Sequence, residues 1–197
     1  MNCAICETRR PRRSCPAVRG EICALCCGES REVTLDCPLD CPYLEEARKH
    51  QREPELDPEK IPNKDVEITE RFAGDNAPLF SLIGRALAGI TLSSPGVTDN
   101  DTREALDAII RTYRTLESGL IYETRPANLI AADIQQRLRA ELDEVRKQLR
   151  ERHGMETVRD SDVLGVLVMF QRIELHRNNG RPRGRAFVHF LRQEFAD

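Results

Sequence analysis

The chain has 197 residues, of which 40% are hydrophobic, and a formal net charge of −3. This length fits one medium domain or a small domain joined to a larger one, and the apolar content is enough for an ordinary core. The longest apolar run, residues 163–170, is too short to cross a bilayer, and the small net charge gives no argument for nucleic acid. The start Met1-Asn2-Cys3 lacks the charged-then-apolar pattern of a signal peptide, so we expect a cytoplasmic protein.

The cysteines are the most informative feature, since all eight lie between Cys3 and Cys41. Disulfides are unfavourable in a reducing compartment, and eight free thiols in so short a segment would be unusual. Structural zinc sites take four ligands in a tetrahedron, often all of them cysteine thiolates. Eight thiolates therefore predict two zinc ions within residues 1–42. The predicted metal ligands are Cys3, Cys6, Cys15, Cys23, Cys26, Cys27, Cys37 and Cys41.

The spacing of the cysteines predicts two interleaved sites. A gap of two residues, as between Cys23 and Cys26, lets one tight turn point two sulfurs at one ion. The adjacent Cys26 and Cys27 cannot both reach one tetrahedral ion without straining the backbone, so we expect them to serve different ions. The first set would be Cys3, Cys6, Cys23 and one member of this doublet, and the second Cys15, the other member, Cys37 and Cys41. Which member serves which ion stays open.

Three elements carry a family resemblance: Cys3-Ala4-Ile5-Cys6, Cys15-Pro16 and Ile22-Cys23-Ala24-Leu25-Cys26-Cys27. Because of these elements, the first 40 or so residues resemble the HIT-type and MYND-type zinc fingers, which are small modules with two interleaved zinc ions. In these families a cysteine pair separated by three residues follows an aromatic or apolar residue, and Cys23 and Cys27 fit that pattern. The resemblance implies a protein–protein adaptor, because such fingers usually dock partner proteins.

The segment departs from these families at two places. Ala17 and Val18 stand where a further ligand is expected after Cys15, and Cys37 stands where the families have a histidine. The resemblance therefore makes Cys26 the candidate substitute ligand.

Iron–sulfur ligation is the alternative metal chemistry. Eight cysteines match two cubane clusters, and Cys41-Pro42 is similar to the end of ferredoxin cysteine runs. The compact spacing of ferredoxin ligands is absent, however, so zinc is preferred.

Arginines cluster in the loop between Cys6 and Cys15, at Arg9-Arg10-Pro11-Arg12-Arg13. Such a cluster can bind phosphate. It can also balance the negative charge that remains when eight thiolates bind two divalent ions. We favour the second interpretation.

Residues 43–77 are predicted to connect the cysteine module to a larger domain. Pro42 suits the first turn of a short helix from Tyr43 to about Arg52. Three prolines and many charges within 53–62 indicate an extended, acidic linker. Inside the module, Glu32–Leu35 is predicted to form a strand.

Residues 78–197 are predicted to form an all-α bundle, so the expected fold class is mostly α with a small cysteine-rich finger. Apolar spacings of three and four predict a helix from Pro78 to about Leu92, a second capped by Asp99 or Asp101, and a third from Pro126. Asp160 or Ser161 is expected to cap a helix over 162–177, whose apolar residues run nearly all round it. Such a helix is usually buried in the middle of a bundle. A last helix is expected over Arg185–Phe195.

The sequence contains no recognisable catalytic motif, and the histidines His50, His153, His176 and His189 are scattered at spacings that suit surface residues better than ligands. We therefore expect a non-catalytic, zinc-binding adaptor or regulatory protein whose partner is another protein. The main alternative is a nucleic-acid-binding protein that uses Arg9–Arg13 and Arg181–Arg185. An enzyme and an iron–sulfur protein are less favoured. Residues 178–185 lack aromatics for base stacking, and we expect a solvated turn there.

Overall fold

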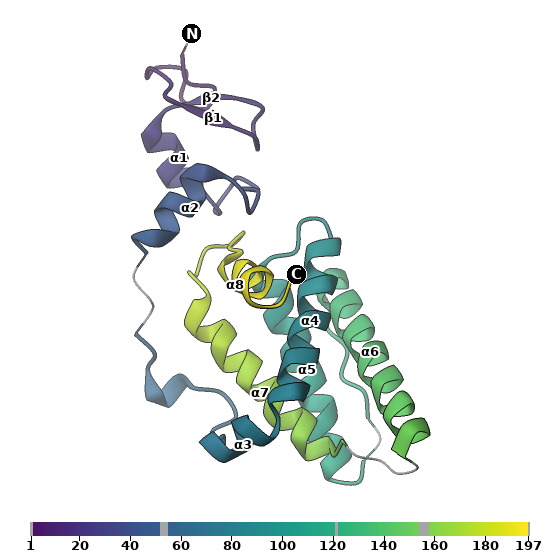
Figure 1. Cartoon of the computed structure of the whole chain (residues 1–197). Helices are drawn as coiled ribbons and strands as arrows, with labels where there is room; N and C mark the ends of the chain where they lie inside the picture. Colours follow the sequence, from purple (N-terminus) through teal and green to yellow (C-terminus); the bar gives the residue numbers. More distant parts are fainter. Residues whose placement is uncertain (1, 52–54, 121, 154–157, 197) are drawn as a thin grey trace.

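The computed structural model describes residues 2–51, 55–120, 122–153 and 158–196. As predicted, the fold is mostly α and carries a cluster of cysteines near its N-terminus. Figure 1 shows the cysteine-rich module at one end of the molecule, above the helical domain that the rest of the chain forms. No helix among the described residues is long and apolar enough to cross a membrane.

The module contains a small hairpin and two short helices. Strand β1 (Arg13–Cys15) pairs antiparallel with β2 (Gly20–Ile22), and α1 (Ala24–Ser30) follows directly. Helix α2 (Pro42–Lys49) begins at the proline expected to start it. These elements are too short to bury a core of their own, so the cysteines make up most of the apolar cluster between them.

The predicted strand over Glu32–Leu35 is wrong. This segment forms only an isolated bridge between Arg31 and Leu35. The amides of Val33 and Leu35 both donate to the Ser30 carbonyl oxygen, at 3.2 and 3.0 Å, which makes the segment a tight turn. Glu32 adopts a left-handed φ of 52°, a conformation that no extended strand allows.

The connection between the module and the helical domain is more structured than a simple linker. Its described part holds a short 3₁₀ helix, η1 (Pro58–Lys60), within the predicted extended segment 53–62, of which residues 53 and 54 lie outside the described residues. It also holds α3 (Glu70–Asp75), which was not predicted. Phe72 of α3 packs so closely on Gly165 that a Cβ there would lie 2.2 Å from the ring. The connection is therefore fastened to the helical domain.

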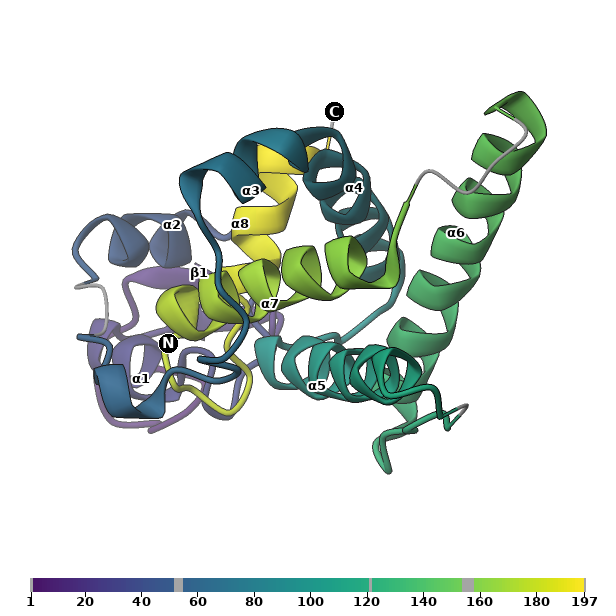
Figure 2. The same ribbon diagram turned by 90° about the horizontal axis from the view of Figure 1, so that it is seen from below.

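Five helices form that domain: α4 (Ala77–Ser93), α5 (Asp99–Glu117), α6 (Leu129–His153), α7 (Asp160–Arg177) and α8 (Ala186–Phe195). Figure 2 shows α7 lying between α5 on one side and α4 and α8 on the other. Its residues from Val163 to Val168 are all buried, as expected for a helix that is apolar nearly all round. The prediction of a central helix here is confirmed.

The helix starts differ in detail from the predicted ones. Thr98, not Asp99 or Asp101, caps α5: its hydroxyl accepts from the Asp101 amide at 3.3 Å, and the Asp101 carboxylate accepts from the Thr98 amide at 2.8 Å. This reciprocal pair is a capping box, with aspartate where glutamate is usual. The Asp99 carboxylate is therefore available to cap another helix.

Two other helices also begin at residues that differ from the predicted ones. Helix α6 begins at Leu129 rather than at Pro126, because the Asn128 side chain accepts from the Ile130 amide at 2.9 Å and fixes the first turn there. Helix α7 begins at Asp160, with Arg159 at its N-cap and no side-chain cap.

Truncating Leu167 tests the central position of α7. Leu167 is fully buried, so Leu167→Ala should leave a cavity and lower the free energy of unfolding by about 2–5 kcal/mol. Urea unfolding followed by circular dichroism measures this, with Leu129→Ala as the control because Leu129 is 85% exposed. Equal midpoints for the two variants would contradict the buried position of α7.

Candidate metal centre and its contact with the helical domain

Four cysteines converge to form a candidate metal centre. The sulfur atoms of Cys3, Cys6, Cys23 and Cys26 all lie within 4.8 Å of one another. Zinc bound by four thiolates at about 2.3 Å would place the sulfurs about 3.8 Å apart. A small inward movement would therefore complete a tetrahedron. The donor set fits a metal that prefers sulfur, and the first predicted ligand set comes together with Cys26 as its fourth member.

Two turns position these sulfurs. Cys3 and Cys6 lie on one turn, closed by the Glu7 amide, which donates to the Cys3 carbonyl oxygen at 2.8 Å. Cys23 is the N-cap of α1, and Cys26 lies in the first turn of that helix. The Cys23 amide donates to the sulfur of Cys3 at 3.2 Å, and the Cys26 amide donates to the sulfur of Cys23 at 3.4 Å. Amide donors aimed at sulfur stabilise thiolates, the form that binds metal.

The thiol pKa values reflect these donors and the crowding of the sulfurs. The hydroxyl of Thr8, followed by the amides of Thr8 and Arg9, lowers the pKa of Cys6 to about 5. A hydrogen bond with Cys23, burial and the other two sulfurs raise the pKa of Cys26 to about 12. These surroundings favour the thiolate at Cys6 and the protonated thiol at Cys26, which would have to lose its proton to become a metal ligand.

The adjacent Cys26 and Cys27 point in different directions, as predicted, because consecutive side chains on a helix diverge by about 100°. Cys26 joins the four-cysteine group, whereas the sulfur of Cys27 accepts from Arg31 Nη2 at 3.8 Å. This resolves which member of the doublet belongs to the first set.

The second predicted set is gathered more loosely. Its members are all buried: Cys15, Cys27, Cys37 and Cys41. Burial raises the pKa of Cys37, while the Glu32 amide lowers it and the nearby sulfurs of Cys41 and Cys15 raise it further. Among the described residues, however, the four-cysteine group above is the one whose ligand atoms all lie within 4.8 Å of one another. The sulfurs of the second set are therefore not brought together to the same degree.

Arg9 is the member of the basic loop that lies against the metal centre. A hydrogen bond with Cys23 raises the pKa of Arg9, and the charges of Cys6 and Cys26 add to the effect. Arg13 instead lies over the Tyr43 ring, 4.9 Å from its centroid. The position of Arg9 agrees with the interpretation that this loop balances thiolate charge.

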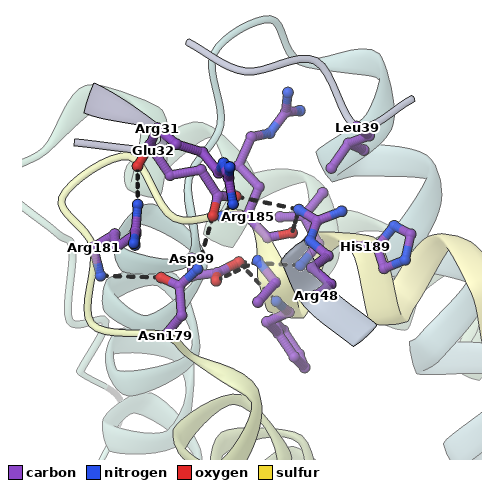
Figure 3. A network of polar contacts seen from close by, with 12 residues as sticks. Arg31, Glu32, Leu39, Arg48, Asp99, Asn179, Arg181, Arg185 and His189 are labelled. Carbon is purple, nitrogen blue, oxygen red and sulfur yellow. Dashed lines mark hydrogen bonds and ion pairs between the residues drawn. The ribbon is translucent and has the colours of Figure 1, made fainter. Parts of the chain in front are cut away.

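Glu32 joins the cysteine module to the helical domain (Figure 3). Its side chain is only 2% exposed. One carboxylate oxygen accepts from Arg48 Nη2 at 3.2 Å and from the Arg185 amide at 3.1 Å, and the other accepts from the Asn179 side chain at 2.8 Å. The Glu32 carbonyl oxygen also accepts from the Arg183 amide at 2.9 Å. A buried carboxylate needs such partners, because burying it without them would be costly.

The basic segment 178–185 is therefore not the solvated turn that we expected. Arg181 Nη1 donates to the carbonyl oxygen of Arg31, and Arg183 forms an ion pair with Asp36. These partners are far away in the sequence, so neighbouring residues gave no sign of them. The segment binds the cysteine module of the same chain.

Asp99 continues the contact into the last helix. Its carboxylate accepts from the amides of Ala186, Phe187 and Val188 at 2.8, 3.0 and 3.1 Å, and thereby caps α8. The Asp99 amide donates to the Gly184 carbonyl oxygen at 2.8 Å. Helix α8 thus starts where the basic segment is held against the module.

Among the described side chains, His50, His176 and His189 take no part in the four-cysteine group. His50 is exposed and lies 3.2 Å from Glu46, whereas His189 is partly buried on α8. The side chain of His153 lies outside the described residues.

Comparison with family models, with curated proteins and with solved structures gives no match for this chain. The function therefore has to be argued from the site itself.

Removing the Glu32 carboxylate tests the contact. Glu32→Ala leaves Arg48 buried without its partner, which should lower the free energy of unfolding by about 3 kcal/mol. It should also speed hydrogen exchange at the Arg185 amide, which donates to the Glu32 carboxylate, whereas the Arg183 amide keeps its bond to the backbone carbonyl oxygen of residue 32. Glu46→Ala removes an exposed carboxylate on α2 and should change neither quantity. Unchanged exchange at the Arg185 amide in Glu32→Ala would show that the Glu32 carboxylate does not hold this contact.

Proposed function

We propose that this chain is a zinc-binding, non-catalytic adaptor or regulatory protein, in which two zinc ions shape the module that binds a partner protein. The convergence of Cys3, Cys6, Cys23 and Cys26 is the observation that carries this proposal. Zinc suits an all-thiolate set, has no redox chemistry and stabilises small modules that cannot build a core. Cys15, Cys27, Cys37 and Cys41 are the proposed ligands of the second ion, and their burial supports this.

The partner surface is proposed to lie on the two cysteine turns. Ile5 and Leu25 are apolar residues inside these turns, and they are 38% and 47% exposed. Both turns contribute ligands to one candidate ion, so metal binding would fix these two side chains relative to each other. Exposed apolar side chains on a rigid support are suited to anchor a protein partner. The resemblance to HIT-type and MYND-type fingers points in the same direction.

Nucleic-acid binding is the weaker alternative. Of its two proposed arginine clusters, Arg181 and Arg183 already bind the module, and Arg9 and Arg13 contact Cys23 and Tyr43. Arg10 and Arg12 of the first cluster and Arg183 of the second still face solvent, and these side chains would have to make the phosphate contacts.

The first test is the metal content of the purified full-length protein. Two tetrahedral sets of thiolates should hold about two zinc ions per chain. Elemental analysis measures this number. Zinc at one ion per chain would remove the second site from the proposal, and iron with visible absorption would replace it with an iron–sulfur protein.

The second test compares partner capture from host extract by the wild type and by an Ile5→Asp/Leu25→Asp variant. The variant should keep its zinc but lose the captured partner, because two charges replace the proposed anchors. Leu129→Asp, on an exposed position of α6, is the matched control and should retain the partner. Identical capture by all three proteins would contradict the proposed surface. Salt-sensitive capture of nucleic acid, in place of a protein, would favour the alternative.

A further inference from the structure

A cavity of about 660 Å³ lies between the module and the helical domain. Helix α2 forms one wall, and the end of α7 together with α8 forms the other. Figure 3 shows two of its lining residues, Arg48 and His189, side by side where these walls approach each other. Sites for small molecules commonly have volumes of about 300–1,000 Å³ and lie where domains meet.

The lining of this cavity is predominantly basic. It contains four cationic side chains and two carboxylates, and two carboxylates outside the lining pair with two of the cations: Glu32 lies 3.2 Å from Arg48 and Glu46 lies 3.1 Å from Lys49. The cations are Arg48, Lys49, Arg177 and Arg192, and the carboxylates are Glu45 and Glu194. Cations gathered in a recess between low-dielectric walls concentrate a positive potential there.

The inner wall of the cavity contains guanidinium donors that have no hydrogen-bond partner among the described residues. The Arg48 side chain is 11% exposed, and its Nη2 donates to Glu32, but its Nε and Nη1 have no hydrogen-bond partner. Burial lowers the pKa of Arg48 despite the neighbouring Glu32 carboxylate. The same Glu32 also accepts from the amide of Arg185, a second partly buried arginine. The Glu32 carboxylate therefore accepts hydrogen bonds from several donors.

The neighbouring arginines also affect the pKa of His189. It lies on α8, with Arg192 Nη2 3.4 Å from its Nδ1. Burial, followed by the charges of Arg48 and Arg192, lowers the pKa of His189 to about 4. The ring is thus neutral at physiological pH and can exchange hydrogen bonds with a ligand without adding charge.

We propose that this cavity binds a small oxyanion with two or more negative charges, carried as phosphate or carboxylate groups. Arg177 and Arg192 would bind its oxygens, and Arg48 and His189 would form the inner wall. Arginine suits both groups, since its planar fork pairs with two oxygens at once. Because α2 and α8 both contribute, the ligand would bridge the module and the helical domain. The site goes beyond the proposed adaptor role and needs only that the module is docked.

The test is a titration of the full-length protein, as purified with its metal, with inorganic phosphate and separately with succinate. At pH 8, where the second ionisation of both acids is nearly complete, each probe carries about two negative charges, and the probes differ in the group that bears them. Backbone amide chemical shifts report binding, at an ionic strength kept constant with sodium chloride so that general screening does not change. We expect saturable shifts in α2 and α8. Binding of phosphate alone assigns the site to phosphorylated ligands, and binding of succinate alone assigns it to carboxylates.

Matched variants locate the site. Arg177→Gln and Arg192→Gln should each raise the dissociation constant about tenfold, the loss expected for one charge-assisted contact. Arg125→Gln removes an exposed arginine far from the cavity and should leave the dissociation constant unchanged. If neither probe gives saturable shifts, or if both cavity variants bind like the wild type, the proposal is overturned. The metal content of each sample is measured in parallel, so a failure of the metal centre is recognised separately.

Discussion

The docking of the module depends on one buried carboxylate. Glu32 lies in a tight turn between the two cysteine-bearing parts of the module, in a left-handed conformation that points its side chain at the helical domain. Its oxygens bind Arg48 of the module and two positions of the segment 178–185. Burying the Glu32 carboxylate would cost free energy if any of these partners were lost. The carboxylate therefore fixes the positions of its partners relative to one another.

The proposed metal ligands and this carboxylate are close neighbours in the chain. Cys27 precedes the turn that holds Glu32, and Cys37 follows it. The backbone amide of Glu32 also lowers the pKa of Cys37, so one residue contacts a cysteine sulfur through its backbone and the helical domain through its side chain. We infer that metal binding at both ends of this turn would stiffen the surface that the module presents to α8.

The sequence predicted those features whose signals are local. Cysteine spacing predicted the converging group at Cys3, Cys6, Cys23 and Cys26, because a two-residue gap constrains the turn itself. The unbroken apolar run of α7 likewise predicted a buried helix, since burial follows from composition alone.

Long-range partners left no comparable signal. Glu32 was assigned to a strand because Glu-Val-Thr-Leu favours one, yet its hydrogen bonds to residues nearly 150 positions away impose a turn. Asp99 was a plausible cap for its own helix, but the competing capping box of Thr98 and Asp101 freed it to cap α8. Segment 178–185 was expected to be a solvated turn, because Arg31 and Asp36, which bind its arginines, are distant in sequence.

X-ray absorption at the zinc edge tests the central claim, that cysteine thiolates alone hold the metal on which the module depends. The account predicts a first shell of four sulfurs at about 2.3 Å for every bound ion, without nitrogen or oxygen ligands. Nitrogen or oxygen in that shell, or a metal–metal distance typical of an iron–sulfur cluster, would contradict it.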